Sequence, residues 1–208
     1  MQTIDFYFSF RSPYAWLAYY RVVRALPELA TRLVRIPVFP PPSYANDPAA
    51  IPAKLAYIGA DVRRLAAAYG LTATPPPSVD TDWIRPHAAW VRAYDDGKAD
   101  AFALELFAQR FSRGHDVAGD AVLREAANAV GANAAAIVAA ADDPAYQGRV
   151  MAGMGQALGA GVFGVPTFIH GGEMFWGNDR LEWLLRRLAA DNGQPGPDLA
   201  ANPMARPY

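Results

Sequence analysis

One stretch near the N-terminus decides the fold: Phe6-Tyr7-Phe8-Ser9-Phe10-Arg11-Ser12-Pro13-Tyr14-Ala15-Trp16-Leu17-Ala18-Tyr19-Tyr20. Residues 3–8 are apolar and aromatic, which predicts a buried strand. After Arg11 the apolar residues recur at helical spacing, and Ser12-Pro13 supplies a preferred N-cap followed by a residue with no N–H to lose. Such a turn places a helix N-terminus, with its free N–H groups and positive dipole end, at the sheet edge. Ser12 is therefore either an ordinary N-cap or the centre of an anion site.

Length and composition indicate a compact protein with one domain and an insertion, or with two small domains. The chain has 208 residues, 52% of them hydrophobic and 19% charged, and a net charge of −1. Without a basic block, nucleic acid is not an expected partner. The N-terminus lacks a basic segment before its first apolar run, and no apolar run is long enough to span a membrane. We expect a cytoplasmic protein.

The reactive residue types narrow the chemistry. The sequence contains no cysteine, which excludes disulfides, thiolate metal sites and a cysteine nucleophile from the protein itself. His87, His115 and His170 are far apart and lack ligand spacing, so we expect surface or turn residues and no metal site.

The order of elements predicts an α/β protein with a split sheet. Residues 33–39 form a second strand after the first helix, and residues 165–169 and 173–176 form a hairpin around Gly171-Gly172. A last helix follows, capped by Asn178 or Asp179. Between the second strand and the hairpin lie predicted helices at residues 52–69, 86–97, 102–111, 120–130, 133–141 and 144–158.

This order divides the chain into three predicted parts. Residues 1–45 and 161–190 form a sheet domain, residues 46–160 a helical insertion, and residues 191–208 a tail. Because the helical block cannot bury its faces alone, we expect it to pack over one end of the sheet and form a cleft there.

Two motifs near the C-terminus, one rich in glycine and one containing proline, differ in how well they indicate a ligand site. Residues 159–164 match the dinucleotide fingerprint G-x-G-x-x-G, but a helix precedes them and a strand follows, the reverse of what that site needs. Val165-Pro166 is more informative because proline removes a strand donor. A cis bond there would turn the Val165 N–H and C=O outward toward a peptide-like ligand; the alternative is a trans proline that starts an edge strand.

Charged residues offer two further candidates. Asn178-Asp179-Arg180 opens the last helix, either as a cap with solvated charges or as a grip for an ammonium and a carboxylate. Lys54 stands at the start of the helical block, either as a ligand contact or as a solvated surface lysine.

Taken together, these segments resemble the thioredoxin-fold branch that contains the kappa-class glutathione transferases and the bacterial 2-hydroxychromene-2-carboxylate isomerases. The matching pieces lie at both ends of the chain and are Phe8-Ser9-Phe10-Arg11-Ser12-Pro13-Tyr14-Ala15-Trp16-Leu17, Pro52-Ala53-Lys54, Gly161-Val162-Phe163-Gly164-Val165-Pro166-Thr167-Phe168 and Met174-Phe175-Trp176-Gly177-Asn178-Asp179-Arg180-Leu181. The resemblance implies a DsbA-like thioredoxin fold with a large helical insertion.

In disulfide oxidoreductases of this fold the turn before the first helix carries Cys-x-x-Cys. The aligned residues here are Ser12-Pro13-Tyr14-Ala15. Because disulfide exchange needs a protein thiolate, that activity is excluded, and the thiol must arrive with a ligand.

The resemblance implies that this ligand is glutathione, with its sulfur near Ser12. It further implies that Val165 beside cis Pro166 pairs with the glutathione backbone and that Lys54 holds the glycyl carboxylate. By the same analogy, the γ-glutamyl end is held by the turn that contains Asn178, Asp179 and Arg180, and the substrate is contacted by Tyr14 and Trp83.

The implied function is a glutathione-dependent isomerase of hydroxychromene carboxylates, acting as a homodimer by reversible thiolate addition. A conjugating glutathione transferase and a non-catalytic binding module are the alternatives. The sequence departs from family members at two places: residues 80–84 stand where an Asn-Ser pair is frequent, and Asn46 is the only amide in a short segment after Phe39. The native substrate can therefore differ.

Overall fold

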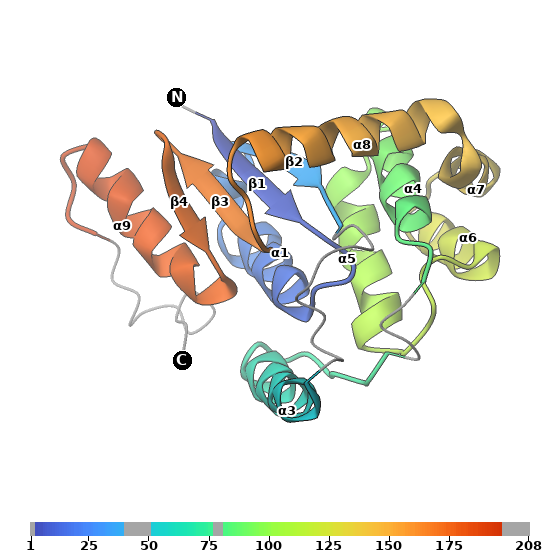
Figure 1. Cartoon of the computed structure of the whole chain (residues 1–208), viewed down its shortest axis with the longest axis horizontal. Helices are drawn as coiled ribbons and strands as arrows, with labels where there is room; N and C mark the ends of the chain where they lie inside the picture. The colour runs from blue at the N-terminus through green and yellow to red at the C-terminus, as the bar shows by residue number, and fades with distance from the viewer. Residues whose placement is uncertain (1–2, 40–50, 77–80, 197–208) are drawn as a thin grey trace.

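The computed structural model describes residues 3–39, 51–76 and 81–196 (Figure 1). It contains a four-stranded sheet in the order β2-β1-β3-β4. β1 runs parallel to β2 and antiparallel to β3, and β4 is antiparallel to β3. The strands are β1 (Ile4–Phe8), β2 (Leu33–Pro37), β3 (Thr167–His170) and β4 (Glu173–Trp176). This arrangement confirms the predicted thioredoxin-like fold.

The predicted helices are all present, with small changes at their ends, and the structure adds a short helix, α2, that the sequence pattern did not predict. They are α1 (Pro13–Ala25), α2 (Pro27–Ala30), α3 (Pro52–Ala68), α4 (Ile84–Asp95), α5 (Ala99–Phe111), α6 (Asp120–Ala129), α7 (Ala134–Asp142), α8 (Pro144–Gly159) and α9 (Leu181–Asp191). α4 begins two residues before Pro86, whose missing N–H costs nothing in a first turn. The last helix is preceded by a 3₁₀ turn, η2 (Asn178–Arg180), and neither Asn178 nor Asp179 caps it.

Helices cover both faces of the sheet, which explains the continuous apolar run of β1. Phe6 and Phe8 belong to the main core beneath α1 and α9, and the ring of Phe6 stacks on Phe168 at 4.5 Å. Tyr7 points to the other face, where it packs with Ile36 and with Ala157 of α8. Figure 1 shows α8 lying across this face of the sheet. A strand buried on both sides cannot alternate polar and apolar residues.

The helical block shares its core with the sheet, as predicted. The ring of Phe8 contacts Trp90 of α4 at 5.0 Å, and Phe10 contacts Phe107 of α5 at 4.8 Å. α8, which the predicted boundaries assign to the insertion, packs directly on β2. The division at residues 46 and 160 stays a prediction, and the core runs across both of these boundaries. No helix in the three described ranges combines the length and apolar character needed to cross a membrane.

The expectation that the three histidines are surface or turn residues is wrong for two of them. His87 is fully buried, and His170 is 2% exposed; His115 is exposed. His170 lies in β3, where its Nε2 is 2.8 Å from Asp191 Oδ2 at the end of α9. Both buried rings make hydrogen bonds to other elements, which the local sequence does not reveal.

The packing of α8 on β2 depends on a small residue at one position. A Cβ atom on Gly153 would lie 3.1 Å from Ile36 Cγ2 and 3.2 Å from the Pro37 carbonyl oxygen, whereas a Cβ on Gly155 would meet nothing within 4 Å. We expect Gly155→Ala to raise the free energy of unfolding by about 0.5–1 kcal/mol, because alanine is the better helix former. Gly153→Ala should lose that gain, and Gly153→Val should destabilise by about 1–3 kcal/mol. Urea denaturation of the three variants measures this, and equal effects of the two alanine substitutions would contradict it.

Candidate functional site

Ser12 caps the N-terminus of α1, at the carboxyl end of β1. Its Oγ accepts a hydrogen bond from the Ala15 N–H at 3.2 Å, and Pro13 occupies the first helical position. The first turn of α1 contains no acidic residue. The positive end of the helix dipole is therefore not offset by a side chain of its own turn.

The cis-proline loop lies against this helix end. The Val165–Pro166 bond is cis, and the Ser12 hydroxyl donates to the Val165 carbonyl oxygen at 3.2 Å. The Pro166 carbonyl in turn accepts from the Gly177 N–H at 2.9 Å, which brings the start of η2 to the same place. Within the described residues, the Val165 N–H donates to no other group. The structure thus brings together Ser12, Val165 and Pro166 as the sequence predicts.

Asn178 is buried and its polar atoms are used internally. Its backbone and side-chain oxygens accept from Arg21 Nη1 at 2.6 and 3.1 Å, and its amide donates to the Tyr69 hydroxyl at 3.3 Å. Arg21 of α1 is also fully buried, and this burial lowers its pKa. The placement favours a role for Asn178 in positioning η2 against α1 rather than in direct contact with a ligand.

Asp179 and Arg180 point to solvent beside the cis-proline loop. Their side chains are 41% and 50% exposed and pair with each other at 2.7 Å. An exposed pair of this kind is worth about 0–1 kcal/mol, so a ligand that carries both an ammonium and a carboxylate can replace it at little cost.

α3 lies beside α1, and Figure 1 shows it apart from the other helices. The Tyr14 hydroxyl donates to Asp61 Oδ2 at 2.9 Å, and the buried Asp61 also accepts from Arg64 at 2.7 Å. Lys54, in the first turn of α3, is exposed. Tyr14 therefore joins the two helices, and Lys54 is free to face a ligand.

Trp83 is 93% buried, which does not fit the predicted substrate contact. The Arg110 guanidinium lies 4.6 Å from the centre of its ring. Burial lowers the pKa of Arg110 to about 10; Asp116 opposes this shift and the nearby charge of Arg11 adds to it. Arg110 stays protonated at neutral pH, so two cations lie near the Ser12 turn. Sequence reasoning missed Arg110, whose only signal is a charge within the apolar helix face around Phe107 and Phe111.

His87 holds the turn that precedes Ser12. Its Nε2 is 3.2 Å from the Phe10 nitrogen, and its Nδ1 is 2.6 Å from the Trp83 carbonyl oxygen. Because the Phe10 N–H can only donate, Nε2 accepts and Nδ1 carries the proton. Complete burial lowers the pKa of His87 to about 4, although the Trp83 carbonyl opposes the shift. The ring is neutral at physiological pH, and it fixes the backbone two residues before the cap.

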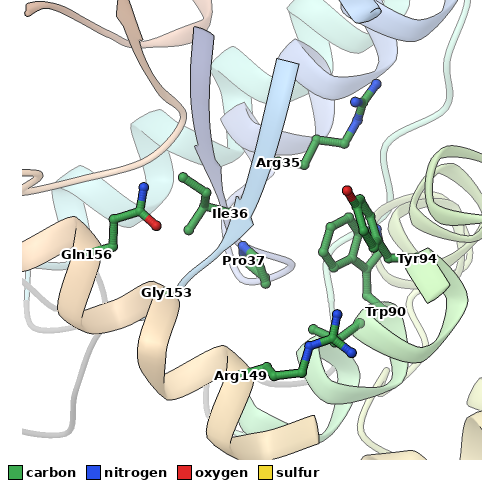
Figure 2. Close-up of a pocket in the computed structure, with 9 residues that line it drawn as sticks. Arg35, Ile36, Pro37, Trp90, Tyr94, Arg149, Gly153 and Gln156 are labelled. Atoms are coloured by element: carbon green, nitrogen blue, oxygen red, sulfur yellow. The ribbon is translucent and has the colours of Figure 1, made fainter. Parts of the chain in front are cut away.

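A separate pocket of about 180 Å³ lies on the outer edge of β2, between α4 and α8 (Figure 2). Its two arginines already have carboxylate partners: Arg35 pairs with Asp100 at 2.6 Å, and Arg149 with Asp95 at 2.6 Å. The pocket therefore offers little unpaired charge to an anion. It is lined by Arg35, Ile36, Pro37, Trp90, Val91, Tyr94, Arg149, Gly153 and Gln156, none of them a predicted site residue. In the described ranges, no group of three or more acidic or histidine side chains could hold a metal ion.

A family model described as the DSBA-like thioredoxin domain matches residues 3–189. The chain belongs to this family. It is 32% identical over 194 residues to a 2-hydroxychromene-2-carboxylate isomerase of Sphingobium xenophagum, with 88% of this chain and 96% of the relative covered. An isomerase of the same name from Pseudomonas putida is 26% identical, with 91% and 97% covered. The resemblance stated from the sequence is confirmed.

A comparison of structures agrees with this assignment of the fold. A solved 2-hydroxychromene-2-carboxylate isomerase superimposes with a TM-score of 0.78 at 24% identity, covering 92% of this chain and 98% of that one. The helical insertion is therefore part of the shared architecture of this DSBA-like chain and that isomerase.

The buried, neutral His87 predicts a pH dependence of stability. Between about pH 6.5 and pH 4 the unfolded chain binds a proton on His87 and the folded chain does not, so stability is full above this window and falls as the pH falls through it. A difference of about 2.5 pKa units corresponds to about 3 kcal/mol. His87→Gln should flatten the profile of unfolding free energy between pH 4 and 7, measured by urea denaturation. A wild-type slope in His87→Gln would contradict the assignment.

Proposed function

We propose that this protein is a glutathione-dependent isomerase of 2-hydroxychromene-2-carboxylate-type aromatic catabolites. The observation that carries the proposal is the serine-capped N-terminus of α1, hydrogen-bonded to the cis-proline loop in a chain without cysteine. Such a site can polarise a sulfur but cannot supply one. The names of the relatives in Sphingobium xenophagum and Pseudomonas putida support the choice of reaction.

The described residues fit a peptide thiol with charged ends. The Val165 N–H is available to pair with a peptide carbonyl beside the cis bond. The exposed Asp179 and Arg180 suit the amino and carboxyl groups of a γ-glutamyl end, and the exposed Lys54 suits a glycyl carboxylate. When bound, glutathione would supply a thiolate that adds to the conjugated acid and is released unchanged.

The Ser12 hydroxyl supports the thiolate by moving its donated hydrogen bond from the Val165 carbonyl to the sulfur. A hydroxyl has one proton, which now lies toward the Val165 carbonyl. It can turn toward a sulfur anion while its oxygen still accepts from the Ala15 N–H and keeps α1 capped. The helix N-terminus and the positive charges of Arg11 and Arg110 favour the same anion.

The pKa of the ligand thiol needs to fall by only a small amount. A free thiol of pKa about 8.5 is only about 3% ionised at pH 7, and lowering that pKa by one unit raises the ionised share to about a quarter. One unit corresponds to about 1.4 kcal/mol. A hydrogen bond to a charged group contributes about 1.5–3 kcal/mol, so the Ser12 hydroxyl is sufficient in magnitude.

Ser12→Ala should lower kcat/KM for isomerisation by about tenfold to a hundredfold, because the hydrogen bond to the sulfur anion is lost. The matched control is Asn133→Ala, which removes the N-cap of α7 far from the cis-proline loop. Both variants should lose about 1 kcal/mol of stability, but only Ser12→Ala should lose activity. Wild-type rates in Ser12→Ala would remove Ser12 from catalysis.

The same assay separates the alternatives for the reaction. Isomerisation regenerates glutathione, so its concentration should stay constant over many turnovers. Consumption of glutathione with formation of a conjugate would identify a transferase instead. Full activity without glutathione would overturn the proposal.

Glutathione at about a hundred times its Kd should stabilise the fold by about 2.7 kcal/mol, which corresponds to about 5–10 °C in Tm for a chain of this size. Lys54→Ala should weaken binding by up to about fivefold, because an exposed ion pair contributes about 0.2–1 kcal/mol. The exposed Lys98 at the start of α5 serves as the control, since it lines a second pocket, beside Tyr94 and Asp100, that contains no predicted site residue. Calorimetric titration with glutathione measures the affinities of Lys54→Ala and Lys98→Ala, and equal values for the two variants would exclude Lys54 as a contact.

A further inference from the structure

Trp176, the last residue of β4, has a half-exposed ring that lies against the backbone of Gly164. The residue is 51% exposed, so much of its large apolar surface gains nothing from burial. A Cβ atom added to Gly164 would lie 2.6 Å from Trp176 Nε1, 3.1 Å from Cε2 and 3.4 Å from Cζ2. Apart from the adjoining residues, these three atoms are its nearest neighbours. The indole therefore fills the space that a side chain at position 164 would need.

Two further contacts hold the backbone at Gly164. The neighbouring ring of Phe163 packs edge-on against Trp176, with 4.9 Å between the ring centres. The Gly164 carbonyl accepts a hydrogen bond from the Thr167 hydroxyl at 2.7 Å. Thr167 is the cross-strand partner of Trp176, so both side chains project from the same face of the β3–β4 hairpin. An aromatic ring and a hydroxyl from one hairpin thus fix the residue that precedes Val165.

This arrangement determines the direction of the Val165 N–H. A trans peptide unit is planar, so the Gly164 carbonyl and the Val165 N–H point in opposite directions. With the carbonyl held by Thr167, the N–H points away from that hydroxyl. On the other side of Val165, the Gly177 N–H holds the Pro166 carbonyl at 2.9 Å. The plane that carries the Val165 N–H is therefore fixed from the Gly164 side, by groups of the hairpin.

We infer that Trp176 is a positioning residue of this site, whose ring holds the Gly164–Val165 peptide in the orientation that presents the Val165 N–H to the ligand. The inference rests on the proposed function and deepens it, because it assigns a residue that acts on the ligand through the loop. A peptide unit that is ordered in advance avoids the entropy cost of ordering it on binding. Trp176 should therefore control the affinity for glutathione, whereas Ser12 acts on the sulfur.

The first test compares glutathione binding, measured by isothermal titration, with kcat and KM for isomerisation. Trp176→Ala should weaken binding about fivefold to thirtyfold, the range expected when one residue must be ordered on binding, and should raise the KM for glutathione. The kcat at saturating glutathione should stay within about twofold of wild type. Trp176→Phe, which keeps an aromatic ring beside the loop, should recover most of the affinity. Thermal denaturation checks that the variants are folded.

The matched control is Trp183→Ala. Trp183 is a tryptophan of α9 that is 54% exposed and lies against Arg186, with 5.2 Å between the guanidinium carbon and the ring centre. This variant should bind glutathione as the wild type does. Wild-type affinity in Trp176→Ala, or an equal loss in Trp183→Ala, would overturn the inference. A lower kcat with unchanged affinity would also overturn it, because the ring would then act on the reaction itself.

A double-mutant cycle tests the contact between the two residues. Gly164 does not have a positive φ angle, so its backbone accepts alanine and the ring of Trp176 is the obstacle. Gly164→Ala should weaken glutathione binding in the wild type, but by less than about twofold in Trp176→Ala, where the three obstructing atoms are gone. Equal effects of Gly164→Ala in the two backgrounds would show that the ring does not hold the loop.

Amide hydrogen exchange separates this inference from the proposed function. A wild-type protein that bound no glutathione would reject the glutathione-dependent reaction. The loop would still be tested by the protection factor of the Gly177 amide, which bonds to the Pro166 carbonyl. Lower protection in Trp176→Ala than in Trp183→Ala supports a ring that orders the loop. Equal protection in the two variants overturns it.

Discussion

The hydrogen bond from the Ser12 hydroxyl to the Val165 carbonyl joins two segments that are 153 residues apart in the sequence. The same oxygen accepts from the Ala15 N–H, so one side chain both caps α1 and closes the helix end against the cis-proline loop. A hydroxyl has one proton and two lone pairs, and the two bonds use different parts of it. A ligand that takes the proton therefore leaves the cap intact. The exchange costs one moderate hydrogen bond and requires no refolding of the helix end.

Buried contacts on three sides keep this turn in place. His87 accepts from the Phe10 N–H, the Pro166 carbonyl accepts from Gly177, and Arg21 holds Asn178 of η2. Each of these bonds connects a segment of the site to a different helix or strand. A site fixed in this way is preorganised, because its backbone is already held in place before a ligand arrives. The buried Arg110 adds a positive charge close to Arg11 without placing a flexible side chain in the solvent.

The local sequence was sufficient for features whose chemistry is local. Ser12-Pro13 requires a helix start, Gly171-Gly172 adopts the positive φ angles of a tight hairpin, and the proline after Val165 marks a break in strand pairing. It was insufficient where two distant faces meet. His87 and Arg110 gain their roles only because α4 and α5 pack on the Ser12 turn, and no neighbouring residue announces that contact. Trp83, an aromatic residue near a predicted loop, proved to be part of the core, and its contact with a substrate stays a prediction.

The two helices that flank the site have separate tasks. α1 carries Ser12 and Arg21, which hydrogen-bond to the cis-proline loop and to η2. α3 is joined to α1 through Asp61 and Tyr69 in its second half. Substitutions in its first two turns can therefore leave the Ser12 contacts undisturbed, because those side chains are exposed. Such a division lets one fold keep a reaction centre while its substrate changes, since function lies in sites carried by the fold and not in the fold itself.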